Sequence, residues 1–236
     1  DVLDELSYEL DDTILLKYYK NWRLRYYQHN RYKKWLSMLF QLCFCLAYLQ
    51  KYFQFTHNDL HCDNVMYSKT NIKYLYYNFN NTFFRIPTFG IIVKIIDYGR
   101  AVYRIGKNRY FSDVFKHNSD AGGQCTHPSE IKHNYEIHHP NYSFDLCRLS
   151  TTIIQHLYPN EIESEDIPLY KVLSAWITDK YNKNVMRFDD FDLYKIIARR
   201  MNNAVPHKYL NHKIFKTFIY NKDNIDSKEH IYKLFK

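Results

Sequence analysis

An apolar stretch over residues 35–53, WLSMLFQLCFCLAYLQKYF, limits the folds that are open to this chain. The stretch nearly has the length of a membrane-spanning helix. Gln41 and Gln50 interrupt it, Lys51 closes it, and a strongly polar decapeptide follows at once. We therefore expect a helix over residues 35–54 that is buried in the core of a globular protein, and we expect no association with a membrane.

The charge and the cysteines restrict the partners and the compartment. The net charge of +8 would attract phosphates or acidic surfaces. Lysine and arginine are nevertheless scattered, and even residues 21–34 mix them with aromatic side chains. A groove for single-stranded nucleic acid is one interpretation of that mixture. A solvated helix face is the commoner one, so we expect no specific binding of nucleic acid.

The five cysteines are odd in number and form no CxxC motif, which indicates a reducing compartment.

Length and composition favour a globular domain. The 236 residues suffice for one large or two small domains with a real core, and the apolar fraction of 46% is ordinary. The 24 tyrosines and 16 phenylalanines are not ordinary, and we attribute them to the coding bias of an AT-rich genome. The acidic N-terminus is not a signal peptide, and a chain that starts at Asp1 is expected to be a piece of a longer protein.

The pattern along the chain predicts a helix, a loop, a small β region, a long loop and then helices. Residues 1–34 read as a polar, helical lead-in, and the loop that carries the decapeptide follows the buried helix. Residues 100–141 are polar and irregular, and a loop of that length is usually functional or disordered. Strands are expected over 65–68, 72–79, 82–86 and 91–97, the middle two joined as a hairpin by two asparagines. Helices are expected over 143–158 with Ser143 as a cap, 169–181, 191–203 and 228–236.

The decapeptide FTHNDLHCDN, residues 55–64, concentrates polar chemistry directly after the buried helix. It contains Asp59 and Asn64, and a strand ends later at Asp97, just before Gly99. Carboxylate and amide oxygens are hard ligands that suit Mg²⁺, which leaves its other positions to water and phosphate. A further carboxylate could accept the proton of a hydroxyl group. These are the parts needed for phosphoryl transfer.

The same residues resemble a known family. His57, Asp59 and Asn64 match the HxDxxxxN catalytic loop of protein kinases, and VKIIDYG, ending at Gly99, resembles the strand and Asp-Phe-Gly metal motif with tyrosine in place of phenylalanine. The stretches PTFGIIVKIIDYGRAVY and NYSFDLCRLS are similar to the kinase-like proteins of large DNA viruses. The resemblance runs from about Trp35 to Phe218.

The resemblance implies a role for each matched residue. Asp59 would be the catalytic base, and Asn64 and Asp97 would hold Mg²⁺ against the phosphates of ATP, with Gly99 completing the metal motif. His57 would be structural and form hydrogen bonds near the metal motif. Two further positions are His61, where Ser/Thr kinases carry a lysine that contacts the γ-phosphate, and Asp145, where kinases place a buried aspartate that anchors the catalytic loop.

Some residues depart from the family pattern. Asn58 replaces the arginine of His-Arg-Asp, so switching through a phosphate bound to that arginine is not expected. The hairpin over residues 72–86 lengthens the segment between the catalytic loop and the metal motif. No glycine precedes Gly90, and no Val-Ala-Ile-Lys strand occurs, so the N-terminal β lobe is not expected within these residues.

The resemblance therefore implies an α+β fold, namely the mostly helical C-terminal lobe of a protein-kinase-like enzyme with a small β-hairpin region at the active site. Residues 1–34 would be the hinge and first helix, and residues 35–236 the lobe, with the catalytic loop at 57–64, the metal motif at 97–99 and an activation-like segment at 100–141. The implied activity is transfer of phosphate from ATP–Mg²⁺ to serine or threonine of a protein substrate. The implied location is the host cytoplasm or the virion of a virus.

Two alternatives stay open. One is a pseudokinase that acts as a scaffold or binding module. The other is a small-molecule kinase of the choline or aminoglycoside type, because HNDL also occurs there; Gly99 favours the protein-kinase type over it.

Overall fold

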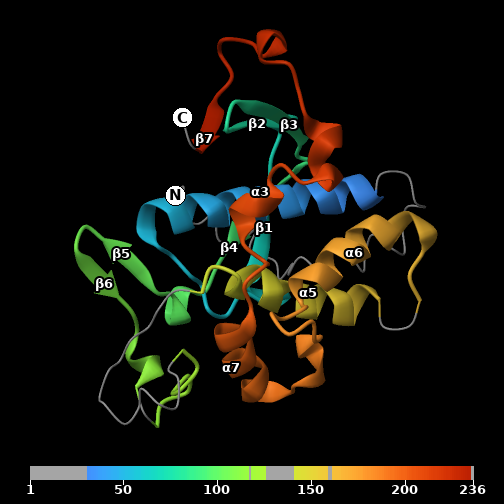
Figure 1. Ribbon diagram of the computed structural model, residues 1–236. Coiled ribbons are helices and arrows are strands. Elements are labelled where there is room, and N and C mark those ends of the chain that lie inside the picture. Colours follow the sequence, from blue (N-terminus) through green and yellow to red (C-terminus); the bar gives the residue numbers. More distant parts are fainter. Residues whose placement is uncertain (1–30, 117, 126–140, 159–160, 235–236) are drawn as a thin grey trace.

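Helix α3 (Arg31–Phe53) crosses the middle of the molecule, with a small sheet on one side and helices on the other (Figure 1). The computed structural model describes residues 31–116, 118–125, 141–158 and 161–234. The prediction for residues 1–34 lies almost wholly outside these ranges. The fold is α+β, as the sequence predicts.

The expected core helix is confirmed and begins four residues earlier than predicted. By length and composition the part from Tyr32 to Phe53 could cross a membrane, but 67% of its most apolar window is buried within the protein. Its two glutamines are paired with backbone groups. Gln41 Oε1 accepts a hydrogen bond from the Val93 N–H at 3.0 Å, and Gln50 Nε2 donates to the Tyr142 carbonyl at 3.1 Å. The two glutamines therefore hold α3 against the segments that contain Val93 and Tyr142.

Strands β1 (Val65–Lys69) and β4 (Ile91–Ile95) form an antiparallel pair with Val65 opposite Ile95. The predicted strand over residues 91–97 thus ends two residues before Asp97. It is also less buried than expected, because Lys94 is exposed. This pair links the polar loop to the residues around Asp97, which lie just beyond its end.

The predicted hairpin is present as β2 (Tyr74–Phe79) and β3 (Thr82–Pro87). Asn80 and Asn81 turn the chain with positive φ angles of 49° and 62°, which asparagine tolerates well. The segment expected to be a helix over residues 228–236 is instead strand β7 (Ile231–Leu234), which pairs parallel with β2. That prediction was wrong because the pairing with β2 gives its backbone partners that an isolated helix would lack.

The helical half contains α5 (Phe144–Leu157), α6 (Ile167–Trp176), α7 (Asp190–Arg200) and the short α8 (Pro206–Tyr209). Helix α6 ends five residues earlier than predicted. Ser143 makes no side-chain capping bond, and its N–H donates instead to Asn141 Oδ1 at 2.9 Å. The cap prediction at Ser143 is therefore corrected.

The segment over residues 100–141 is more regular than predicted where it is described. It contains the hairpin β5 (Tyr103–Ile105) and β6 (Asn108–Tyr110), followed by the 3₁₀ turn η3 (Asp113–Phe115). These strands are only three residues long, too short for the sequence pattern to show. Residues 126–140 of the segment lie outside the described ranges.

Aromatic side chains fill much of the core around α3. The Phe40 ring lies 4.9 Å from that of Phe84 on β3, 5.4 Å from Tyr77 on β2 and 5.2 Å from Phe215. Such tilted and edge-on contacts add to the free energy gained by burying apolar area. The sheet formed by β3, β2 and β7 is thereby fastened to one side of α3, while β1 and β4 lie next to the polar loop.

Candidate active site

The polar loop is anchored by one buried carboxylate. Asp145, in the first turn of α5, is fully buried and accepts hydrogen bonds from the backbone N–H groups of His57 and Asn58 at 3.0–3.1 Å. Burial raises the pKa of Asp145, and the His57 ring together with the two N–H donors opposes this rise. The loop backbone is thus fixed to the helical half of the protein.

His57 joins the loop to the segment after β4. Its Nε2 lies 2.8 Å from the Ile96 carbonyl, and its ring packs against the Tyr98 ring at 5.5 Å between centroids. The residue has no exposed surface. A buried ring with these contacts supports the backbone and does not reach a substrate.

Asn58 stands in a left-handed conformation with φ of 62°. Its Nδ2 donates to the Arg100 carbonyl at 3.0 Å, and its own carbonyl accepts a bond from Gln124 Nε2 at 2.8 Å. Asparagine suits both the conformation and the partners. The residue that departs from the family pattern thus connects the loop to the segments that follow Gly99.

Asp59 presents the central carboxylate. Its Oδ1 accepts a hydrogen bond of 2.6 Å from the hydroxyl group of Tyr194 on α7. Arg100 Nε lies 3.7 Å from Oδ2, and His61 Nε2 lies 3.9 Å from Oδ1. The side chain is 18% exposed, so solvent reaches a carboxylate that its neighbours hold in place.

Asn64, which is nearly buried, holds the main chain of Asp59. Its Nδ2 donates to the Asp59 carbonyl at 2.9 Å and lies 3.2 Å from His61 Nε2. Within the described ranges its Oδ1 accepts no hydrogen bond. The amide oxygen is therefore left for another partner.

Asp97 lies beside this loop. Its backbone is left-handed, with φ of 58°, and its Oδ1 accepts a bond from the Gly99 N–H at 3.2 Å. A Cβ atom on Gly99 would lie 3.2 Å from that same oxygen, so glycine leaves the carboxylate room. The Ile96 N–H donates to the Asn64 carbonyl at 3.0 Å. Asn64 and Asp97 thus project from backbone segments that are bonded to each other.

The chemistry of the Asn64 and Asp97 side chains would suit a Mg²⁺ ion. The set offers one carboxylate and one amide oxygen, and the described residues contain no group of three His, Cys, Asp or Glu side chains arranged to hold a metal. Mg²⁺ commonly takes only one or two protein oxygens and fills its octahedron with water and phosphate. Such an ion would neutralise the charge of a polyphosphate, and the Asp59 carboxylate could accept a proton from a hydroxyl group.

Comparison with known proteins shows similarity to serine/threonine-protein kinases. No family model matches the chain. Haspin of Mus musculus, a serine/threonine-protein kinase, is 45% identical over 62 residues, which make up 26% of this chain and 8% of haspin. A protein of Acanthamoeba polyphaga mimivirus that is named as a candidate serine/threonine-protein kinase is 23% identical over 196 residues, or 77% of this chain and 46% of the viral protein. The chain is thus similar to serine/threonine-protein kinases, and a viral protein is among these relatives.

This kinase-like protein spans less than half the length of these two relatives, namely 8% of mouse haspin and 46% of the mimivirus protein. The relatives include a viral protein, as the motifs of the sequence predict, and also cellular ones. What the complete protein acts on is therefore a matter for proposal.

Sequence reasoning missed three residues at the site of the kinase-like protein. Tyr194 bonds to Asp59, Arg100 stands beside the same carboxylate, and the Arg148 guanidinium lies 4.9 Å from the centre of the Tyr194 ring. Tyr194 follows Asp59 by 135 positions and sits among ordinary helix-forming residues. No local pattern in the sequence marks it.

Cys62 lies in the loop but is not poised to react. Its thiol is buried and Thr152 donates a hydrogen bond to it, while burial raises its pKa to about 12. A thiol in that state is a poor nucleophile at neutral pH. Cys62 fills space between the loop and α5.

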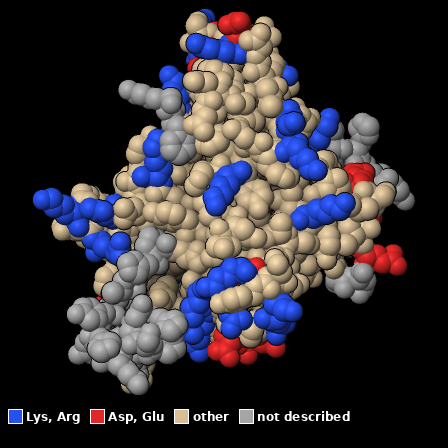
Figure 2. Space-filling model, in the orientation of Figure 1, with Lys and Arg blue, Asp and Glu red and all other residues tan. Residues whose placement is uncertain are grey.

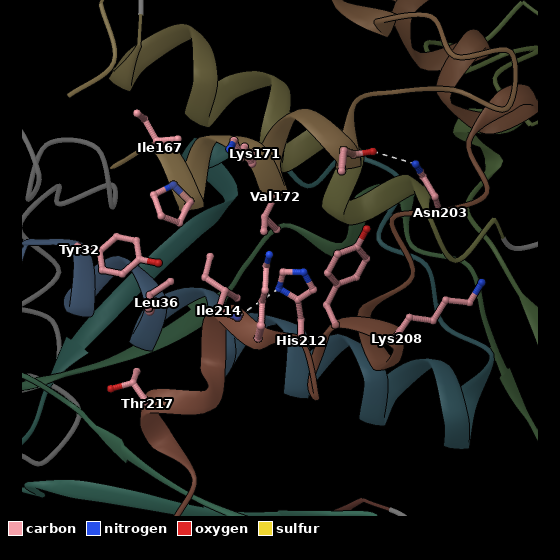
Figure 3. Close-up of a pocket in the computed structure, with 14 residues that line it drawn as sticks. Tyr32, Leu36, Ile167, Lys171, Val172, Asn203, Lys208, His212, Ile214 and Thr217 are labelled. Carbon is pink, nitrogen blue, oxygen red and sulfur yellow. Dashed lines mark hydrogen bonds between the residues drawn. The ribbon is translucent and has the colours of Figure 1, made fainter. Parts of the chain in front are cut away.

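A cavity of about 930 Å³ lies elsewhere on the kinase-like protein, between the first turns of α3, helix α6 and the residues around α8 (Figure 3). It is lined by apolar side chains such as Leu36 and Val172 and bordered by Lys171, Lys208 and Lys213. None of the site residues lines it. Because α3 rises about 1.5 Å per residue, this cavity and the polar loop stand near opposite ends of the helix.

Proposed function

We propose that the complete protein transfers phosphate from ATP–Mg²⁺ to a serine or threonine hydroxyl of a protein substrate. In this proposal the described residues form the helical C-terminal lobe, and an N-terminal lobe of the complete protein covers the nucleotide. The main support is the geometry around Asp59. Asp145 anchors the loop that carries Asp59, and a backbone hydrogen bond joins the segment of Asn64 to the segment of Asp97. The names of the relatives support the same activity at the level of the family.

The proposed roles follow from position and chemistry. The Asp59 carboxylate takes the proton of the substrate hydroxyl. At the same time the hydroxyl oxygen bonds to the γ-phosphorus, and the bond between that phosphorus and the ADP oxygen breaks. Asn64 Oδ1 and the Asp97 carboxylate hold Mg²⁺, which would neutralise phosphate charge when bound. His61 is close enough to Asp59 to contact a phosphate at the same place, whereas His57 keeps the loop in shape.

Positive charge favours anionic ligands at this enzyme. In the face shown in Figure 2, lysine and arginine are spread over the surface and the acidic residues gather towards its edges. With the net charge of +8, this distribution supports acidic or phosphorylated partners in general. A viral origin, and with it a location in the host cytoplasm or the virion, is part of the same proposal.

A scaffold without phosphoryl transfer is the second candidate. The observation that favours it is the cavity between α3 and α6, which could take an apolar group with nearby negative charge and stands apart from the Asp59 site. A small-molecule kinase is the third, and it differs from the main proposal only in the acceptor.

The test is phosphoryl transfer by the full-length protein. Wild type is compared with Asp59→Asn and Asp97→Asn, with casein-like protein and small alcohols as acceptors, and with Asp223→Asn as a control on an exposed turn. Activity that is lost in the first two variants and kept in the control supports the enzyme. The preferred acceptor then separates a protein kinase from a small-molecule kinase. A wild type that is as inactive as the variants, with no detectable binding of ATP–Mg²⁺, supports the scaffold instead.

A further inference from the structure

Tyr194 of α7 holds the carboxylate of Asp59 through a hydrogen bond, whereas the loop residue Asn64 bonds to the main chain of Asp59. Asn64 bonds to the carbonyl of Asp59 and not to its carboxylate, and so fixes the main chain. The carboxylate is free to rotate unless another group holds it. The Tyr194 hydroxyl does so through the 2.6 Å bond to Oδ1, a length typical of a strong bond to a charged acceptor.

Tyr194 is itself held firmly. The Arg148 and Arg100 guanidinium groups lie 4.9 Å and 5.3 Å from the centre of its ring, and the rings of Phe144 and Phe191 lie 6.0 Å and 6.2 Å away. Burial and the bond to Asp59 raise the pKa of Tyr194, so its hydroxyl stays protonated and able to donate. A side chain with this many neighbours is a fixed support and is poorly suited to act as a plug that a substrate pushes aside.

The two oxygens of Asp59 are thereby made unequal. Oδ1 is occupied by Tyr194, whereas Oδ2 accepts no hydrogen bond from any residue in the described ranges and has Arg100 Nε at 3.7 Å. That nitrogen is too distant for a hydrogen bond but lies within ion-pair distance of Oδ2. Oδ2 is the oxygen left to receive a proton.

We infer that Tyr194 is a positioning residue, which orients the Asp59 carboxylate so that Oδ2 faces the hydroxyl group of the acceptor. The inference rests on the proposed function and adds a residue from α7 to the catalytic machinery. Tyr194 acts through Asp59 and does not itself touch the reacting atoms.

The first arm of the test is kinetic and uses the full-length protein. Tyr194→Phe keeps the ring and its contacts and removes only the hydroxyl. We expect kcat to fall by about tenfold or more, because a misdirected base loses part of general-base catalysis, while KM for ATP stays unchanged. Tyr181→Phe is the matched control, since Tyr181 is 59% exposed and packs its ring against Lys180 and Arg200. It should leave kcat unchanged. An unchanged or raised kcat in Tyr194→Phe overturns the inference.

The second arm does not need activity. Crystal structures of wild type and Tyr194→Phe are compared for the Asp59 side chain. We expect one conformation in wild type and a changed or divided one in the variant. An Asp59 carboxylate that keeps its place without the hydroxyl overturns the inference even if the protein transfers no phosphate. If wild type is inactive but Asp59 moves in the variant, the proposed function fails while the positioning contact stands.

Discussion

Asp145 binds the backbone N–H of His57 through both oxygens of its carboxylate, at 3.0 and 3.1 Å, although the two residues are 88 positions apart. The bond joins the first turn of α5 to the loop that follows α3. It explains how a loop of polar residues keeps one shape inside a largely apolar neighbourhood. The candidate active site therefore depends on a residue that lies outside it.

Asp145→Asn should lower the free energy of unfolding by about 2 kcal/mol or more. An amide has one oxygen and places an NH₂ group against a backbone donor, so at least one charge-assisted bond is lost in a buried place. Chemical denaturation followed by circular dichroism measures the change. Asp189→Asn serves as control, because Asp189 is exposed and its side chain makes no capping bond. Equal stability of the two variants would contradict the anchoring role.

Substitution of Asn58 should separate strain from hydrogen bonding. Asn58→Gly loses the bond to the Arg100 carbonyl but adopts φ of 62° freely, whereas Asn58→Ala loses the same bond and is strained. We expect the alanine variant to be less stable than the glycine variant by about 1 kcal/mol or more. Denaturation midpoints at equal m-values give the difference. An alanine variant as stable as the glycine variant would show that the positive φ is not required.

Asp97→Asn should weaken the binding of Mg²⁺ while leaving the fold intact. The amide keeps the shape of Asp97 and can still accept the Gly99 N–H, but it removes a charged ligand. We expect the Mg²⁺ concentration for half-maximal ATP binding by the full-length protein to rise roughly 10- to 100-fold, the range found even for groups that only support a metal ligand. Titration calorimetry measures it. Unchanged Mg²⁺ dependence would remove Asp97 from the proposed ligand set.

Stability should fall between pH 7 and pH 5 in part because of His212. Burial and the nearby Lys213 lower the pKa of His212, and its neutral Nδ1 accepts the Ile214 N–H at 3.3 Å. A pKa below that of the unfolded chain means that the unfolded state binds more protons as the pH drops, so stability is lost with acid. His212→Asn keeps a capping acceptor that does not titrate, and we expect its stability to depend less on pH. Urea unfolding at several pH values tests this, and parallel curves for the two proteins would refute it.

Leu234→Ala should destabilise the protein by about 2–5 kcal/mol, the usual cost of a cavity at a buried leucine. Leu234 has no exposed surface and lies at the end of β7, opposite Phe79. Lys233→Ala, on the exposed part of the same strand, is the control and should change stability little. Thermal unfolding compares the two. A small effect at Leu234 would mean that β7 contributes little to the core.

Much of the fold could be predicted because its elements carry strong local patterns. The apolar run that becomes α3 and the two asparagines between β2 and β3 act through neighbours in sequence. The order and spacing of His57, Asp59 and Asn64 likewise mark a loop that is read without knowledge of the rest. The structure places all three where the loop meets Asp145 and the end of β4.

The remainder depends on contacts between distant segments. Residues 231–234 form a strand because β2 offers a free edge, which their own sequence does not reveal. Tyr194 joins the site because α7 packs below the loop, and nothing around it in the chain distinguishes it from a core tyrosine. Ser143 resembles a cap, but its side chain makes no capping bond, and its own N–H donates to Asn141 Oδ1.

The parallel pairing of β2 with β7 also has a consequence for folding during synthesis. The ribosome releases the β2–β3 hairpin before helices α5 to α8 and releases β7 after them. Until then the outer edge of β2 is an open row of backbone donors and acceptors, and open edges of this kind recruit strands from other chains. A nascent chain would therefore be at its most prone to aggregate in the interval before β7 emerges, and holding that edge would be a task for a chaperone.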